Sequence, residues 1–456
     1  MKKTLIALAA LAAASGVLAQ TPTARAGGTS NVTIFGVLDA TVTRLTVTDG
    51  GSQLIMDGSG RNMSSRLGFR GVEDMGGGLS AAFWLEAAVD PSNGAGSNTT
   101  INNTSGGDRV SFNTSGANVS NPQSTLGARQ GLTFNRASTI SLIGKDWGEI
   151  RLGRDYNPAF WNYTVFDPFG TVGVGSALNV IGGPLAPVGV QAFPPGAAYP
   201  MVRASNSLGW LSNDMGGFRA QIQYALSEQP TKCVTPLANV NTNTCWGADG
   251  DGKLLGFRLS YAQGPLSVAY GYSKTNYGDV ASSGTGLLVT AAGSAGTVTT
   301  AGASLAANAA YRGDYTQSNL GAAYQMGAAR LMAQYGTQKY EKSGAATLRK
   351  QSHLLLGGQI AMGPWTYKAT YNYAKRDDAA GTSAEIGSKS SQIAVGTQYD
   401  FSKRTAVYAT YSTNKLEAGG TTAGTLRANL GLAGAALTAG KSATATGLDI
   451  GLRHSF

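Results

Sequence analysis

Arginines recur in this chain at positions that alternate with large apolar residues. In the run Arg66-Leu67-Gly68-Phe69-Arg70, the two apolar side chains share one parity and the two arginines share the other. Successive side chains of an extended strand point to opposite faces. If the face with Leu67 and Phe69 meets lipid, Arg66 and Arg70 turn away from it, because an arginine at mid-membrane costs roughly 2–4 kcal/mol. Guanidinium groups collected on one polar face attract anions.

The same parity argument assigns further charged side chains to that polar face. It places Glu86, Arg151 and Arg203 there, because large apolar residues flank each of their strands at the opposite parity. The run 136–142 alternates poorly, so parity leaves the direction of Arg136 open. A single inward arginine is equally well explained by a wall salt bridge or a solvated charge. Several arginines on neighbouring strands favour a positive ladder that concentrates anions.

Enzymatic chemistry finds little support in the sequence. There is no G-x-S-x-G or H-E-x-x-H motif, and His353 and His454 are the only histidines. Residues 76–81 fit G-x-G-x-x-A but join two predicted strands, whereas a nucleotide-binding turn opens a helix. Residues 249–252 resemble the start of a calcium loop, yet the positions that follow lack its ligands. We therefore expect no enzyme, no metal and no cofactor.

The elements that position these residues are short strands. From residue 32 to 456 the chain repeats segments of about ten alternating residues, separated in turn by short Gly-rich turns and longer polar loops, as in membrane β-barrels. An antiparallel sandwich is the alternative, but Trp and Tyr gather near strand ends, where membrane interfaces favour them. We predict an all-β fold, a 16-stranded antiparallel transmembrane barrel with an aqueous lumen. The predicted strands are 31–45, 62–74, 78–90, 129–143, 148–155, 202–213, 217–226, 253–263, 265–277, 315–326, 328–341, 351–362, 364–376, 389–401, 404–415 and 445–456.

One long segment, 157–200, has neither strand nor helix periodicity. Its 44 residues hold seven of the 14 prolines, many aromatic residues and a single charge, Asp167. Disordered segments normally carry many charges and few aromatic residues. We therefore expect an ordered, partly buried loop.

The first residues predict export. Lys2 and Lys3 precede an apolar run that ends in Val17-Leu18-Ala19, which is typical of a secretory signal, 1–19. The barrel domain would then span 20–456, and loss of the two lysines lowers the formal charge from +10 to +8. A basic balance also suits nucleic-acid binding, but an exported protein seldom meets nucleic acid, and we expect none.

Cys233 and Cys245 are the only cysteines. They lie in one polar stretch of an exported chain, which favours a disulfide over a metal site, since neither histidine is close in sequence. Such a bridge would restrain an outer loop by roughly 3 kcal/mol in the chain-entropy model.

Several segments resemble the general porins of Gram-negative outer membranes, and most of all the anion-selective porins of β-proteobacteria. The resemblance is spread over nearly the whole mature chain, and the stretch 65–79 is long enough to be specific. The matching segments are 32–36, 65–79, 148–155, 402–406 and 451–456.

The resemblance implies a site and an assembly. In those porins three wall arginines face acidic groups where the third outer loop narrows the barrel. By motif the arginines match Arg66, Arg136 and Arg203, and the acids match Glu86 and Asp167. Arg70 and Arg151 would be further lumen charges.

The resemblance also implies a homotrimer in the outer membrane of a Gram-negative bacterium, in contact with lipid and lipopolysaccharide. The terminal Phe456 would be read by the outer-membrane assembly machinery. The chain departs from the relatives in 91–128, 278–314 and 184–200.

The function expected from these observations is passive diffusion of small hydrophilic solutes and ions, with a preference for anions. One alternative is a substrate-selective channel in which Phe160, Trp161 and Phe166 form a slide for sugars or aromatic acids, against the simpler reading that these rings pack on the wall. A second alternative is a barrel whose long loops serve in adhesion.

Overall fold

The computed structural model describes most of the barrel and part of the segment inside it. The described residues are 30–48, 51–96, 134–181, 202–227, 252–277, 313–342, 348–376, 387–419, 426–427, 436–437 and 440–456. The predicted signal 1–19, Cys233 and Cys245, and the stretch 184–200 lie outside them.

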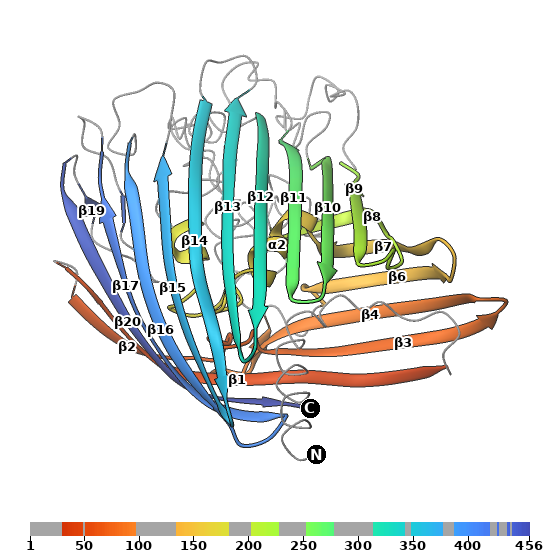
Figure 1. The fold of residues 1–456 in the computed structure, drawn as a ribbon, viewed down its shortest axis with the longest axis horizontal. Coiled ribbons are helices and arrows are strands. Elements are labelled where there is room, and N and C mark those ends of the chain that lie inside the picture. The colour runs from red at the N-terminus through yellow and green to blue at the C-terminus, as the bar shows by residue number, and fades with distance from the viewer. Residues whose placement is uncertain are drawn as a thin grey trace, which may run out of the picture.

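Sixteen long antiparallel strands form a closed barrel (Figure 1). Each strand pairs with the next along the chain, and β20 pairs with β1 from Val37↔Ser455 to Val47↔Ala445, which closes the ring. The predicted strands are confirmed in number and order. Their bounds are β1 Asn31–Val47, β3 Arg66–Gly76, β4 Leu79–Asp90, β6 Ala137–Gly144, β7 Gly148–Tyr156, β8 Arg203–Leu211, β9 Phe218–Ala225, β10 Leu254–Gln263, β11 Leu266–Tyr277, β12 Gly313–Met326, β13 Ala329–Lys342, β14 Leu348–Met362, β15 Trp365–Arg376, β16 Lys389–Asp400, β17 Thr405–Glu417 and β20 Ser442–Ser455.

The outer face of the barrel is apolar because of the period of two. Large aliphatic side chains stand exposed on it around the ring, among them Ile34, Ile140, Leu208, Leu331 and Ile450. Residues of the opposite parity, such as Asp39 or Gln334, are buried within the barrel. No helix among the described residues has the length and apolar character needed to cross a bilayer.

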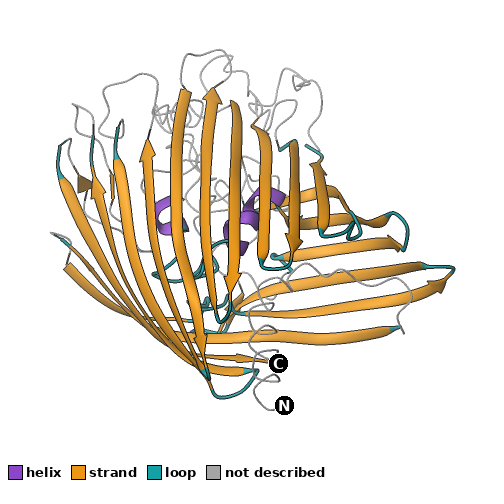
Figure 2. Cartoon of the chain, in the orientation of Figure 1, coloured by secondary structure: helices purple, strands orange, loops and turns teal. Residues whose placement is uncertain are grey.

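Short turns join the strands at the rim that carries the carboxyl end (Figures 1 and 2). The β12–β13 and β14–β15 turns have two residues each, and Gly327 and Gly363 take positive φ values of 59° and 63° there. Such backbone is readily available only to glycine, which allows the strands to reverse within two residues. The residues of the predicted longer connections lie mainly outside the described part of the chain.

One additional strand, β2 (Gly51–Asp57), was not predicted from the sequence. It pairs with the outer end of β1, Thr41–Val47, whereas β3 pairs only with the other end, Asn31–Val37. Between β2 and β3 the chain turns inward and is fixed by Asp39, whose Oδ2 accepts the backbone N–H groups of Asn62 and Met63 at 2.8 and 2.7 Å. The alternation had predicted that the second barrel strand begins at residue 62. In the structure it begins at Arg66.

Three further strands are two residues long. The strand β5 (Ala95–Gly96) pairs with the end of β4. The strands β18 (Leu426–Arg427) and β19 (Ala436–Leu437) pair with each other outside the barrel sheet.

The segment after β7 lies inside the barrel, and its described part is 157–181. It begins with the helix α2 (Pro158–Val165), which is capped by Asn157 because the side-chain oxygen accepts the Ala159 N–H at 2.9 Å. Proline at the first helical position suits this start, since its missing N–H would have no partner there. A second, short helix, α3 (Leu178–Ile181), closes the described part. Figure 2 shows the helices within the ring of strands.

Polar contacts fix α2 to the inner wall. The Asn162 amide donates to the carbonyl of Ala269 on β11 at 2.9 Å and accepts from Arg258 Nε on β10 at 2.5 Å. Asn319 on β12 donates to the Ala159 carbonyl at 2.9 Å. The helix therefore packs across three neighbouring strands, as Figure 1 shows behind β10 to β12.

Glycines on the strands provide the room in which the segment lies. Six of them face it from successive parts of the wall, and a Cβ at any of these positions would meet its atoms. We call this set the glycine track: Gly256 under Pro158, Gly271 under Ala159, Gly321 under Phe166, Gly357 near Pro168, Gly396 under Phe169 and Gly447 under Val174. The track runs from β10 to β20, so the segment crosses about half of the inner circumference.

The glycine track makes the position of the segment sensitive to small additions. We expect Gly321→Val to displace the Phe166 ring, to lower the free energy of unfolding by about 1–3 kcal/mol through overpacking, and to raise the single-channel conductance because the loop withdraws from the wall. The measurements are thermal unfolding in detergent and planar-bilayer recording.

A matched control is Gly209→Ala on β8, where the nearest atom to the added Cβ would be 3.6 Å away. Conductance and stability of Gly321→Val equal to those of this control would show that the track does not hold the segment.

Candidate functional site

Three arginines meet on the inner wall formed by β3 to β8. Arg66 opens β3, Arg136 directly precedes β6, and Arg203 opens β8. Strand register brings them together, because Gly68 pairs with Glu86 and Glu86 pairs with Ala137 across β3, β4 and β6. Arg66 and Glu86 are 7 % and 4 % exposed, so both lie within the protein interior and away from the outer face.

Two acceptors link the three guanidinium groups into one row. Glu86 Oε1 lies 3.8 Å from Arg66 Nη1 and accepts from Arg136 Nε at 2.5 Å. The Tyr156 hydroxyl accepts from Arg136 Nη2 at 2.7 Å and from Arg203 Nη2 at 2.8 Å. We call this row the arginine ladder. Its three cations face one carboxylate, which leaves a surplus of two positive charges.

Glu86 therefore lies between the arginines and not opposite them. The family resemblance had implied that Glu86, like Asp167, faces the three arginines. Because Glu86 stands on β4, directly beside Arg66 on β3 and Arg136 before β6, its carboxylate is part of the same wall. It offsets the repulsion among like charges that are held close together.

Tyr156 is the residue of this site that the sequence analysis missed. Its ring lies under the Arg203 guanidinium, with 4.4 Å from Cζ to the ring centroid, and stacks on Phe160 at 6.1 Å. The register of β7 against β8 shifts between Gly153 and Asp155. This bulge overrides simple alternation at the end of β7, so parity offered no reliable signal for Tyr156.

Arg151 belongs to a separate group that is balanced by acids. Its guanidinium contacts Glu149 Oε1 at 2.8 Å and Asp155 Oδ2 at 2.6 Å. It is 6 % exposed, and it faces inward as parity predicted. Two carboxylates around one guanidinium compensate its charge, so Arg151 adds little to the positive surplus of the ladder.

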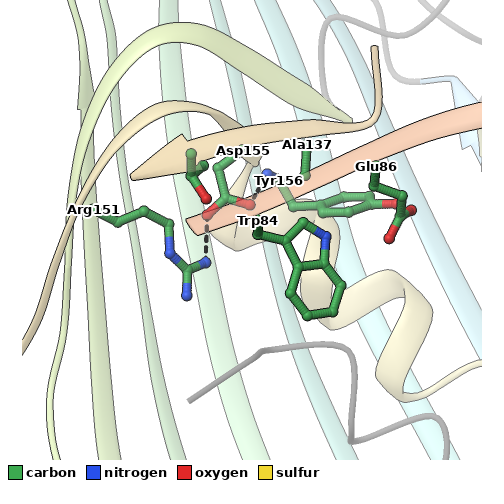
Figure 3. A pocket seen from close by; sticks show the side chains of 7 residues that line it. Trp84, Glu86, Ala137, Arg151, Asp155 and Tyr156 are labelled. Atoms are coloured by element: carbon green, nitrogen blue, oxygen red, sulfur yellow. Dashed lines mark hydrogen bonds and ion pairs between the residues drawn. The ribbon is translucent and has the colours of Figure 1, made fainter. Parts of the chain in front are cut away.

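A cavity lies beside the ladder and joins it to the Arg151 group. Its lining includes Trp84, Glu86, Arg151, Asp155 and Tyr156. Figure 3 shows Arg151 joined to Asp155 on one side of it, and Trp84, Tyr156 and Glu86 on the other. Solutes that reach this part of the wall therefore meet both aromatic and charged groups.

Asp167 lies on the inserted segment, where its carboxylate organises the segment itself. Oδ1 accepts the Phe169 N–H at 2.9 Å, and Oδ2 accepts those of Thr171 and Ala177, both at 3.0 Å. Burial raises the pKa of this carboxyl, while the three N–H donors and the nearby Lys368 ammonium act in the opposite direction. The carboxylate is 3 % exposed and is occupied by local backbone.

The aromatic residues proposed for a solute slide are covered. Phe160 and Trp161 are each 5 % exposed and Phe166 is 1 % exposed. Trp161 and Phe166 pack in one cluster with inner-wall residues such as Ala269 and Met332. Packing of the loop on the wall therefore accounts for these rings, as the simpler interpretation held.

Phe456 lies beside the first strand at the closure of the barrel. It exchanges backbone hydrogen bonds with Gly36 at 3.0 and 3.1 Å, and its ring covers that glycine.

The described residues contain no cluster of three or more His, Cys, Asp or Glu side chains that could hold a metal ion.

Fold and wall geometry define a water-filled outer-membrane barrel. A family model of the Gram-negative porins matches residues 7–419. The chain belongs to the Gram-negative porin family, whose members are outer-membrane channels and not enzymes.

Relatives and solved structures resemble it over their full length. Outer membrane porin protein 32 of Delftia acidovorans is 30 % identical over 456 residues, with all of both chains covered. The structure of an anion-selective porin from Comamonas acidovorans is 27 % identical, with a TM-score of 0.64, and the match covers 94 % of this chain and 100 % of that one. The trimer form of OmpT from Vibrio cholerae, at 13 % identity and a TM-score of 0.54, covers 94 % of this chain and all of its own and shares the fold.

The ladder predicts how loss of its carboxylate acts. Glu86→Gln removes the charge that pairs with Arg66 and Arg136, and the hydrogen bond from Arg136 is then made to a neutral acceptor. It is expected to lower the free energy of unfolding by about 2–3 kcal/mol and to increase the preference for chloride as the positive surplus grows. Thermal unfolding and the reversal potential in a salt gradient measure the two effects.

The control is Asp214→Asn, since Asp214 pairs with Arg219 at the exposed rim, where both side chains are about half exposed. An unchanged reversal potential in Glu86→Gln, equal to that of the control, would contradict the electrostatic role of Glu86.

Proposed function

We propose that this porin passes small hydrophilic anions in preference to cations, and that the arginine ladder is its filter. The observation that carries the proposal is the row of Arg66, Arg136 and Arg203 held by one carboxylate and one phenol. In a lumen with low-dielectric walls, a fixed positive surplus enriches anions and repels cations. Passage needs no cofactor or energy source, because the solute diffuses along its own gradient.

One relative supports the same direction of selectivity. The protein from Comamonas acidovorans, with 27 % identity, is described as anion-selective. In this chain the three arginines predicted by motif all enter one row with Glu86 and Tyr156, and the positive surplus of that row would favour anions.

The inserted segment supplies the second half of the mechanism, size exclusion. Its described part, 157–181, lies on the glycine track of β10 to β20, while the ladder stands on β3 to β8. Solutes at this level therefore pass between a packed, mostly uncharged loop and a positive wall. Asp167 contributes by holding the turn after α2 in shape through its three backbone N–H contacts.

Assembly of the channel as a homotrimer fits the same picture. The porin from Vibrio cholerae that shares the fold is described in a trimer form. Phe456 at the closure of the barrel would serve as the signal for the outer-membrane assembly machinery, and the apolar outer face would contact lipid and lipopolysaccharide.

Neutralising the ladder tests the proposal. The triple variant Arg66→Gln, Arg136→Gln, Arg203→Gln is expected to lower the chloride-to-potassium permeability ratio by about tenfold, at the lower end of what a focused field contributes. Reversal potentials in planar bilayers under a potassium chloride gradient give this ratio.

Arg219→Gln removes a positive charge at the exposed rim and serves as the control. If the triple variant kept the permeability ratio of this control, the ladder would not be the filter. Cation preference in the unaltered channel would overturn the proposed selectivity altogether.

A further inference from the structure

Three lumen-facing side chains form a compact cluster next to the ladder. Phe35 on β1 and Trp84 on β4 have ring centroids 4.6 Å apart, and Arg70 Cζ on β3 lies 5.5 Å from the centroid of each ring. The register supports this contact, because Arg70 pairs with Trp84, and Phe35 pairs with Gly68. A Cβ at Gly68 would collide with the Phe35 ring, so glycine lets that ring lie across β3.

The Arg70 guanidinium differs from those of Arg66, Arg136 and Arg151, which pair with carboxylates. Within the described part of the chain it makes no ion pair, and it is exposed. Arg151, in contrast, is compensated by Glu149 and Asp155. Cation–π contact uses the faces of the guanidinium group, so its N–H edge stays free for a planar anion.

A cavity adjoins the cluster and gives a solute access to it. Its lining includes Thr33, Arg70, Trp84, Thr139 and Arg151. Trp84, Thr139 and Arg151 also line the cavity beside the ladder that Figure 3 shows, so the two spaces share a wall. Trp84 stands two residues from Glu86 on the same face of β4, which places the cluster one step along the wall from the filter.

We propose that Arg70, Trp84 and Phe35 form a binding subsite for aromatic carboxylates that pass through the channel. The carboxylate would take a bidentate hydrogen bond from the N–H edge of Arg70. The aromatic ring attached to it, coplanar with that carboxylate, would stack against Trp84. A simple anion such as acetate uses only the first contact, and a neutral aromatic compound uses only the second.

This inference rests on the proposed function, since the solute must be an anion that enters the channel. It differs from the slide considered on sequence grounds, because that slide used Phe160, Trp161 and Phe166, which are buried in the loop packing. Trp84, the ring of the cluster that lines the cavity, belongs to the barrel wall instead, and so does Phe35.

The test is block of the chloride current by benzoate in planar bilayers containing the full-length channel. Benzoate is compared with cyclohexanecarboxylate, which has the same charge and nearly the same size but no π system. We expect benzoate to bind about fivefold more tightly than cyclohexanecarboxylate, which corresponds to one aromatic stacking contact.

Variants separate the two contacts. Trp84→Leu is expected to abolish the preference for benzoate and to leave block by cyclohexanecarboxylate unchanged, whereas Trp84→Phe keeps most of the preference. Arg70→Gln is expected to weaken block by both carboxylates. The matched controls are Trp365→Leu on the outer face, where Trp365 is 40 % exposed, and Arg219→Gln at the rim.

Equal block by benzoate and cyclohexanecarboxylate in the unaltered channel would overturn the proposal. An undiminished preference for benzoate in both Trp84→Leu and Trp84→Phe would overturn it as well. Reversal potentials in potassium chloride, measured in the same membranes, report the ladder independently. If the channel showed no chloride preference but was still blocked by benzoate in a Trp84-dependent way, the proposed filter would be wrong and the proposed subsite would stand. If it preferred chloride but showed no Trp84-dependent benzoate block, only the subsite would be wrong.

Discussion

The packing of one irregular segment against the inner wall is the interaction on which the interior of this barrel depends. The side chains and backbone of the segment can lie directly against the wall only where no wall side chain intervenes, and the glycine track provides that clearance on six strands. Amides from the wall then satisfy the segment: Gln351 donates to the Ile181 carbonyl at 2.7 Å and Gln392 to that of Val174 at 2.8 Å. At its far point the Val174 N–H reaches Asp449 on β20 at 2.9 Å.

The position of the segment also determines which part of the inner wall can present charged side chains to the lumen. Because it occupies the inner face from β10 to β20, the wall from β3 to β8 is left for the arginine ladder and the adjoining cavities. The ladder is stable for a local reason. Guanidinium groups held close together repel, and each here has an acceptor in Glu86 or Tyr156 that lowers the cost of burial. A surplus of positive charge remains. The strands that carry it are held in position by the backbone hydrogen bonds of the barrel sheet.

The alternation of side chains gives each strand two faces with different requirements, one toward lipid and one toward the lumen. Outward residues such as Leu331 and Ile393 are exposed on the face that meets lipid. Pairing of β20 with β1 joins the last barrel strand to the first, which removes the open sheet edge that a bilayer would not tolerate. Inward residues are then free to be polar, aromatic or glycine according to what lies in the lumen. Arg70 and Trp84 show this freedom, since they sit on strands whose opposite face is apolar.

The sequence by itself determined the class, the strand number and order, and the inward direction of Arg66, Glu86, Arg151 and Arg203, because a period of two is a local property of extended chain. It also predicted an ordered loop over 157–200 from the lack of charge, and the structure describes 157–181 of that segment. Only the tertiary structure showed where the alternation is interrupted and which side chains on neighbouring strands come into contact. The bulge in β7 turned Tyr156 into the site, β2 displaced the start of β3, and strand adjacency placed Glu86 among the arginines. Asp167 could be assigned to the loop by sequence, but its partners are backbone groups several residues away, which only the folded turn brings together.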